Sequence, residues 1–263
     1  MTRRVLVWPD VDAMAAGVAA SFADLCSSWL ASHDGPMHVA LTGGRSGAAS
    51  MRALAALPEE AIDWDRIHLW WGDERWLPAG DSERNDELAD QCLLNHISIP
   101  AGNIHRVAAP DQGIDIDEAA ARYRNELARF ETDPNWGHPE FALVFLGVGP
   151  DGHIASLFPH RTGIEVTDVP VIAVTDSPKP PSERVSITRP VINSAAHVWL
   201  MLSGADKASA LGLALAGASR VEVPAAGIKG RVETVYFADQ AAASAVPANV
   251  TLRFGIGDRV GRD

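Results

Sequence analysis

FALVFLGVGPDGHIASLFP, residues 141–159, opens with six consecutive apolar residues and then turns through three glycines to a histidine. A short apolar run without polar alternation is typical of a strand that is buried on both faces, and such strands occur in parallel sheets. The letters that follow the run, GVGPDG, also satisfy the G-x-G-x-x-G pattern of dinucleotide-binding turns. The stretch therefore predicts an α/β fold, and its loop is either a nucleotide site or a support for His153.

Six further apolar runs share this character, at 4–8, 37–42, 67–71, 169–174, 197–202 and 232–237. Helix-like segments lie between the runs, at 11–30, 46–56, 85–95, 117–130 and 205–216. The first of them carries one continuous apolar stripe from Val11 to Leu30. Strands that alternate with helices form right-handed βαβ units. We therefore predict a three-layer α/β/α sandwich with a mostly parallel, Rossmann-like sheet, in one domain over residues 1–263.

The composition argues against several classes of protein. Aspartate and glutamate number 34 against 22 lysines and arginines, and the formal charge of −12 disfavours nonspecific binding to nucleic acid or to an anionic membrane. The N-terminal apolar stretch is too short for a signal peptide, and no run of 18 apolar residues is present. Cys26 and Cys92 lie far apart in helix-like segments and form no C-x-x-C motif. We therefore expect two buried thiols in a reducing cytoplasm. We expect a cytoplasmic protein with a small-molecule ligand, and a monomer because no segment indicates an interface.

Polar, glycine-containing sequences follow four of the predicted strands. They are LTGGRSG (41–47), WWGDERW (70–76), LGVGPDGH (146–153) and LSGADK (202–207). In open α/β sheets, ligands bind beyond the carboxyl ends of the strands, at the point where the strand order reverses. We therefore expect these four loops to surround one site.

The GVGPDGH loop favours a support for histidine over a nucleotide turn. Pro150 removes a backbone donor from the turn, and Asp151 places a carboxylate where a pyrophosphate would lie. Pro159 leaves room for only about two helical turns after Gly152, whereas the dinucleotide motif needs a full helix. Histidine titrates near neutral pH and suits a general base, which a nearby carboxylate such as Asp151 can orient. A histidine that caps a short helix is the alternative for His153.

Phosphate-binding character is concentrated in LTGGRSG. Backbone N–H groups at a helix start, hydroxyls and a guanidinium all hold oxyanions. The candidates are Thr42, Gly43, Gly44, Arg45 and Ser46. The loop lacks the G-x-x-x-x-G-K-[ST] of a Walker A motif and the second glycine of a nucleophile elbow. An ordinary strand-to-helix turn is the alternative.

Two other loops add charged candidates. Arg75 can bind an anionic group with two parallel hydrogen bonds, while Asp73 can hold sugar hydroxyls or orient that arginine. A solvated charge cluster explains the same letters equally well. Lys207 offers a further positive charge, although a lysine at a helix start is most often only a surface charge. No H-E-x-x-H motif or Cys-His cluster is present, so we predict no metal site.

Together these motifs resemble the 6-phosphogluconolactonases over most of the chain. The glycine-rich phosphate loop of that family resembles 41–47, its D-E-R motif 73–75, and its G-x-D-G-H-x-A-S-L-F-P signature 149–159. Two further family segments resemble PPSERVSIT (180–188) and GADK (204–207). The related glucosamine-6-phosphate deaminases share D-G-H but have F-N-E-P and D-E-Y where this chain has SLFP (156–159) and DER. One departure is Arg45, which intervenes where many lactonases have a small hydroxyl residue.

The resemblance implies hydrolysis of 6-phospho-D-glucono-1,5-lactone to 6-phosphogluconate, the second step of the oxidative pentose phosphate pathway, without metal or cofactor. In that reaction His153 would be the general base that activates water, and Asp151 would orient it. Arg184 joins the loop residues above as a candidate for binding phosphate or the oxyanion. The alternatives are an amino-sugar-phosphate deaminase or a sugar-phosphate sensor without catalysis.

Overall fold

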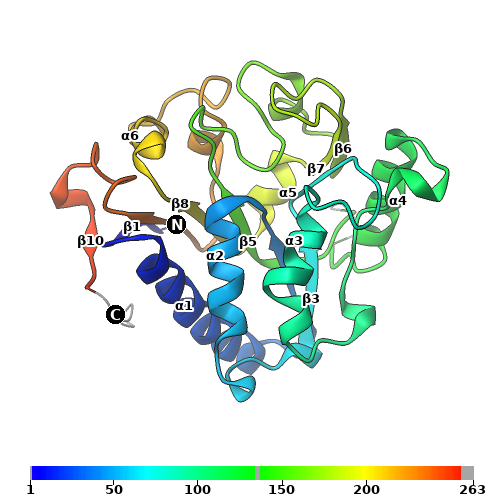
Figure 1. The fold of residues 1–263 in the computed structure, drawn as a ribbon, viewed down its shortest axis with the longest axis horizontal. Coiled ribbons are helices and arrows are strands. Elements are labelled where there is room, and N and C mark those ends of the chain that lie inside the picture. Colours follow the sequence, from blue (N-terminus) through cyan, green and yellow to red (C-terminus); the bar gives the residue numbers. More distant parts are fainter. Residues whose placement is uncertain (1, 134–136, 256–263) are drawn as a thin grey trace.

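A seven-stranded sheet forms the centre of the protein (Figure 1). The structure, a computed structural model, describes residues 2–133 and 137–255. The sheet has the order β10-β1-β9-β8-β5-β2-β3, and all of its neighbouring strands are parallel. Its strands are β1 (Thr2–Trp8), β2 (Met37–Leu41), β3 (Ile67–Trp71), β5 (Phe141–Gly147), β8 (His197–Leu202), β9 (Glu233–Asp239) and β10 (Leu252–Arg253). The predicted parallel sheet is confirmed, and only the two-residue strand β10 is new in it.

Helices cover both faces of this sheet. Figure 1 shows α1 (Val11–Ser32), α2 (Gly44–Ala55) and α3 (Asn85–Cys92) beside one another on one face. The opposite face is covered by α4 (Ile116–Ala128), α5 (Arg189–Ser194) and α6 (Ala208–Leu215). Strand β2 explains the two layers, because Val39 and Leu41 pack with the first group whereas Ala40 packs with the second. The three-layer sandwich is confirmed, and Cys26 and Cys92 are both buried and free as predicted.

The longest helix, α1, is a core helix. By length and composition alone it could cross a membrane. Its apolar stripe, however, includes Met14, Val18 and Phe22, which are buried against the sheet. The side chain of Asp10 caps its first turn by accepting a hydrogen bond from the Ala13 N–H at 2.8 Å. The stripe that the sequence predicted is thus satisfied by packing inside the protein.

A second, antiparallel sheet lies beside the main one and corrects one prediction. It consists of β4 (Asp73–Arg75), β7 (Arg184–Ile187) and β6 (Val171–Val174), in that order. The run 169–174 was predicted to join the parallel sheet, and this prediction is wrong. A four-residue apolar strand fits either kind of sheet, and here its ladder partner is β7, whose mixed sequence gave no strand signal.

The strand order reverses between β2 and β5. From β2 the chain continues outward to β3, whereas from β5 it continues in the opposite direction to β8 and β9. The loops that leave β2 and β5 therefore diverge, and a crevice opens between them at their carboxyl ends. The Thr42 hydroxyl accepts a hydrogen bond from the Gly147 N–H at 3.1 Å and joins the two strand ends at the floor of this crevice.

Candidate active site

A cavity of about 430 Å³ lies at this crevice. The four polar loops predicted to surround one site follow β8, β5, β2 and β3, which are consecutive neighbours in the sheet, and all four contribute to its wall. The predicted residues that line it are Thr42, Gly43, Gly44, Arg45, Ser46, Asp73, Arg75, His153, Arg184 and Lys207. Within residues 2–133 and 137–255, no three His, Cys, Asp or Glu side chains are grouped so that they could hold a metal ion.

Asp151 lies behind His153 and contacts it directly. Its Oδ1 atom is 2.5 Å from His153 Nδ1, and the imidazole stacks on the ring of Phe158 with 4.6 Å between centroids. Backbone hydrogen bonds close the loop, from the Gly149 N–H to the His153 carbonyl and from the Gly152 N–H to the Gly149 carbonyl, both at 2.9 Å. Gly152 has φ +79°, a conformation that favours glycine. The pair is therefore held by a tight turn at the end of β5.

No α-helix follows this turn. The residues from Pro150 to Pro159 form turns and isolated bridges, among them one between Val148 and Ile154. A dinucleotide site needs a helix N-terminus at this point, so that alternative is wrong. The alternative in which His153 caps a short helix is wrong for the same reason.

The LTGGRSG loop forms another part of the cavity wall and begins helix α2. Gly43 is the N-cap and Gly44 has φ +76°, so the first turn of the helix lies at the cavity, where its dipole favours an anion. Arg45 donates from Nη2 to the Ser203 carbonyl at 3.0 Å, and the Ser46 hydroxyl donates to the Ser203 hydroxyl at 3.2 Å. The loop is thereby fastened to the end of β8, and part of the hydrogen-bonding capacity of Arg45 is used for this.

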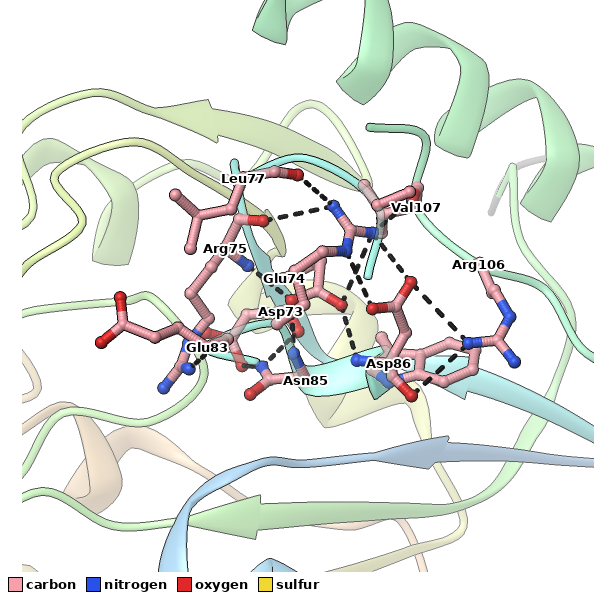
Figure 2. A network of polar contacts seen from close by, with 12 residues as sticks. Asp73, Glu74, Arg75, Leu77, Glu83, Asn85, Asp86, Arg106 and Val107 are labelled. Atoms are coloured by element: carbon pink, nitrogen blue, oxygen red, sulfur yellow. Dashed lines mark hydrogen bonds and ion pairs between the residues drawn. The ribbon is translucent and has the colours of Figure 1, made fainter. Parts of the chain in front are cut away.

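Asp73 and Arg75 are fixed by a buried network and are not a solvated cluster. The carboxylate of Glu74 accepts the backbone N–H groups of Arg75, Asn85 and Asp86 at 2.7, 2.7 and 2.8 Å (Figure 2). Glu74 is 1% exposed. Burial and the Asp86 charge raise the pKa of the Glu74 carboxyl, whereas the Arg84 charge and the backbone N–H groups oppose the rise. Glu74 therefore joins β4 to the start of α3.

Asp73 holds the loop that carries His153 through a hydrogen bond with Ser156. Its Oδ2 atom accepts a hydrogen bond from the Ser156 hydroxyl at 2.6 Å, and its backbone carbonyl accepts one from Asn85 Nδ2 at 2.8 Å. Arg75 lies at the same wall and donates from Nη1 to the Glu83 carbonyl. Part of the Asp73 carboxylate is therefore already engaged with the protein, and so is part of Arg75.

Several lining residues were not predicted, and Lys179 is the most informative. Its Nζ atom lies 3.1 Å from His153 Nδ1 and 3.2 Å from Asp151 Oδ1. Asn85 also lines the cavity. Neither residue follows a strand of the parallel sheet, so the rule that predicted the other loops did not reach them. A signal for Lys179 was present in the composition, because the 22 basic residues include only three lysines.

The sequence and the fold both match one family of sugar-phosphate enzymes. The model of the family described as glucosamine-6-phosphate isomerases/6-phosphogluconolactonase matches residues 9–237. The chain belongs to this family. Among the family's curated members, the 6-phosphogluconolactonase of Streptomyces coelicolor is 45% identical over 253 residues, which are 95% of this chain and 97% of the relative. That of Mycobacterium tuberculosis is 40% identical over 250 residues, 94% of this chain and all of the relative.

Solved structures of the family have the same fold. The crystal structure of the 6-phosphogluconolactonase from Thermotoga maritima superposes with a TM-score of 0.78 at 28% identity, over 90% of this chain and all of that one. A monomeric glucosamine-6-phosphate deaminase of the NagB superfamily has a TM-score of 0.73 at 19% identity, over 93% of this chain and all of that one. At that identity the second likeness concerns the fold alone, so the fold is common to both branches of the family.

Proposed function

We propose that this chain hydrolyses 6-phospho-D-glucono-1,5-lactone to 6-phospho-D-gluconate in the oxidative pentose phosphate pathway. The observation that carries the proposal is the imidazole–carboxylate pair of His153 and Asp151, with 2.5 Å between Nδ1 and Oδ1, at a cavity that a glycine-rich helix start also lines. The names of the curated relatives and the SLFP sequence after the D-G-H motif support the lactonase over the deaminase.

In the proposed mechanism, His153 is the general base. Because Asp151 accepts a hydrogen bond from Nδ1, the proton of the neutral ring lies there and the lone pair of Nε2 is free to take a proton from water. The resulting hydroxide forms a bond to the lactone carbonyl carbon, and the carbonyl oxygen becomes an oxyanion. The bond from that carbon to the ring oxygen then breaks, and the imidazolium returns its proton to the ring oxygen, which becomes a hydroxyl.

Cationic groups and backbone N–H groups around the cavity hold the anionic parts of the substrate in this proposal. In the proposal, the phosphate is bound by residues at the α2 N-terminus and by two cationic side chains that line the cavity: Thr42, Gly43, Gly44 and Ser46, with Arg45 and Lys207. Arg75, Asp73 and Arg184 also line the cavity, and in this proposal they bind the sugar ring or the oxyanion. We also propose that the protein is a monomer and that it is cytoplasmic. Sedimentation velocity at several protein concentrations measures its oligomeric state.

The decisive experiment is proton release from freshly prepared lactone, followed at constant pH against an enzyme-free blank because the lactone also hydrolyses spontaneously. We expect a rate above the blank that is proportional to enzyme concentration. Ammonia release from glucosamine 6-phosphate is measured in parallel and should be absent. Ammonia release without lactone hydrolysis would identify a deaminase, whereas binding of 6-phosphogluconate without either reaction would identify a sensor.

A further inference from the structure

Lys179 contacts both members of the His153–Asp151 pair. Its ammonium nitrogen is 3.1 Å from His153 Nδ1 and 3.2 Å from Asp151 Oδ1, and its side chain is 40% exposed toward the cavity that it lines. Lysine is rare in this chain, which has only Lys179, Lys207 and Lys229. Two of these three line the same cavity. The charge of Lys179 therefore lies beside the two residues proposed for catalysis.

The loop that carries Lys179 is held by partly buried hydrogen bonds. Arg184 is 5% exposed, and it donates to the carbonyls of Lys179 at 3.2 Å, Pro180 at 3.1 Å and Pro181 at 3.1 Å. The Ser177 hydroxyl donates to the Lys179 carbonyl at 2.8 Å and accepts the Lys179 N–H at 3.2 Å. The backbone at Lys179 is thus held on both sides, and only its side chain reaches the pair.

The Nδ1 proton that the proposed mechanism gives to His153 leaves Asp151 as the acceptor for Lys179. An ammonium group has donors and no acceptor, and His153 Nδ1 already donates its proton to Asp151, so Lys179 also donates to Asp151 Oδ1. Burial by itself raises the pKa of the Asp151 carboxyl. The hydrogen bond from His153, the charge of His153 and then the charge and hydrogen bond of Lys179 lower it well below its usual range. A second proton on the ring would create an imidazolium 3.1 Å from the ammonium, which is an unfavourable contact between like charges.

Six other charged groups line the cavity. They are Arg45, Asp73, Arg75, Arg184, Asp206 and Lys207. Among them, Asp73 is directed at Ser156 and Arg184, and Lys207 pairs with Asp206 at 3.3 Å. The positive charge that contacts the imidazole itself is that of Lys179.

We propose, on the basis of the lactonase function above, that Lys179 is a positioning residue that keeps Asp151 ionised and the His153 imidazole neutral. A neutral imidazole is the form that can take a proton from water. The ammonium group also destabilises the imidazolium formed during the reaction, which favours return of that proton to the ring oxygen of the lactone. Lys179 thereby extends to lower pH the range over which His153 acts as a base.

The test is the pH profile of kcat at saturating lactone for the wild type and for Lys179→Met, between pH 5 and 8. We expect the acidic limb of Lys179→Met to move to higher pH by about one unit, because the like charge beside the ring is gone. The variant is then up to about tenfold slower on the acid side and approaches the wild type at pH 8. Lys179→Arg, which keeps the charge, should lie closer to the wild type, and Lys229→Met, at an exposed lysine outside the cavity lining, should coincide with it.

A second measurement does not depend on turnover. NMR titration of the His153 ring in the free enzyme should give a higher midpoint in Lys179→Met than in the wild type, and the phosphate of the substrate does not contribute to it. Unchanged midpoints in both the titration and the acidic limb would overturn the proposal. The failure of the lactonase function itself is distinguishable, because it would appear as a wild-type rate equal to the enzyme-free blank.

Discussion

Gly149 determines how closely the His153 ring approaches the backbone of its own loop. A Cβ atom at residue 149 would lie 1.9 Å from His153 Nδ1 and 2.4 Å from Asp151 Oδ1. These distances are far below van der Waals contact, so any side chain at this position must displace the ring, the carboxylate or both. The contact between the imidazole and the carboxylate thus depends on a residue that has no part in the proposed chemistry.

Gly149→Ala should therefore lower kcat by about 10²-fold, because small misplacement of a catalytic group has a cost of that order. The urea midpoint should change little, since the displaced ring borders an open cavity. Gly35→Ala is the matched control, because a Cβ atom at residue 35 meets nothing within 4 Å, and it should keep full activity. Wild-type kcat in Gly149→Ala would contradict the importance of this close approach.

His153→Ala should lower kcat by about 10²–10⁴-fold, the contribution typical of a general base. The far-UV circular dichroism spectrum should be unchanged, because the side chain lies at the cavity and outside the interior clusters. His96→Ala, at an exposed histidine, is the control for the loss of an imidazole. A near-normal kcat for His153→Ala would remove the base from the mechanism.

The sequence predicted the cavity residues that obey a topological rule. Arg45, Asp73, His153 and Lys207 follow consecutive strands of one parallel sheet, so their loops must meet beyond its carboxyl edge. Lys179 was not predicted because it lies on the loop between β6 and β7, which are strands of the small antiparallel sheet. No topological rule places that sheet beside the cavity. The contacts of Arg184 with its own loop also depend on tertiary structure, which a residue pattern does not encode.

At the scale of elements, long periodic segments were predictable and short mixed ones were not. The apolar stripe of α1 and the uninterrupted apolar letters of β5 predicted the type of each element correctly. Strand β4, by contrast, is the charged tripeptide 73–75, and it is a strand because β7 pairs with it and Glu74 is bound from α3. Intrinsic β propensity opposes charged residues here, and tertiary contacts override it.

Glu74→Gln should destabilise the protein by about 3 kcal/mol, because an amide cannot accept at both positions and its NH₂ group would face a backbone N–H. The Glu74 side chain is buried, so water cannot replace the lost acceptor. Urea unfolding measures the change, and Glu60→Gln, at an exposed glutamate, is the control. A loss below about 1 kcal/mol would mean that the junction of β4 and α3 does not depend on this carboxylate.

At the scale of the whole molecule, a cluster of three neighbouring histidines links stability to pH. The Trp70 indole N–H donates to His38 Nδ1 at 3.0 Å, and His68 Nδ1 and His105 Nε2 are 2.9 Å apart. Burial, followed by the charges of His68 and His105, lowers the pKa of His38 to about 3. Burial also lowers the pKa of His68 and His105. These rings are therefore neutral in the folded state at a pH where the unfolded chain already binds protons.

The sign of the effect follows from this difference in proton binding. A histidine whose folded pKa lies below its unfolded value of about 6.5 costs no stability above that pH, and stability is lost as the pH falls below it. His38 alone should contribute a loss of about 2 kcal/mol between pH 7 and 5. Glu74, whose pKa is raised to about 7, acts in the opposite direction over the same range, so the His38 contribution is read from the difference between a variant and the wild type. We expect one unfolding transition, because one interior cluster includes side chains of both sheets and we propose that residues 1–263 form one domain.

His38→Gln tests this, because it stays neutral and can still accept from the Trp70 N–H. Its unfolding free energy should depend less on pH between 7 and 5 than that of the wild type, by about 2 kcal/mol. His33→Gln, at an exposed histidine, should keep the wild-type dependence. Parallel pH curves for His38→Gln and the wild type would exclude His38 as the source.

The scarcity of lysine makes the cavity chemically addressable. Of the three side-chain amines in the sequence, Lys179 and Lys207 line the cavity and only Lys229 does not. An amine-reactive label therefore reports on the cavity at two positions of three, and a bound ligand that covers the two cavity amines leaves Lys229 as an internal standard in the same peptide map. Site occupancy can thus be read by mass spectrometry without a labelled substrate and without mutation.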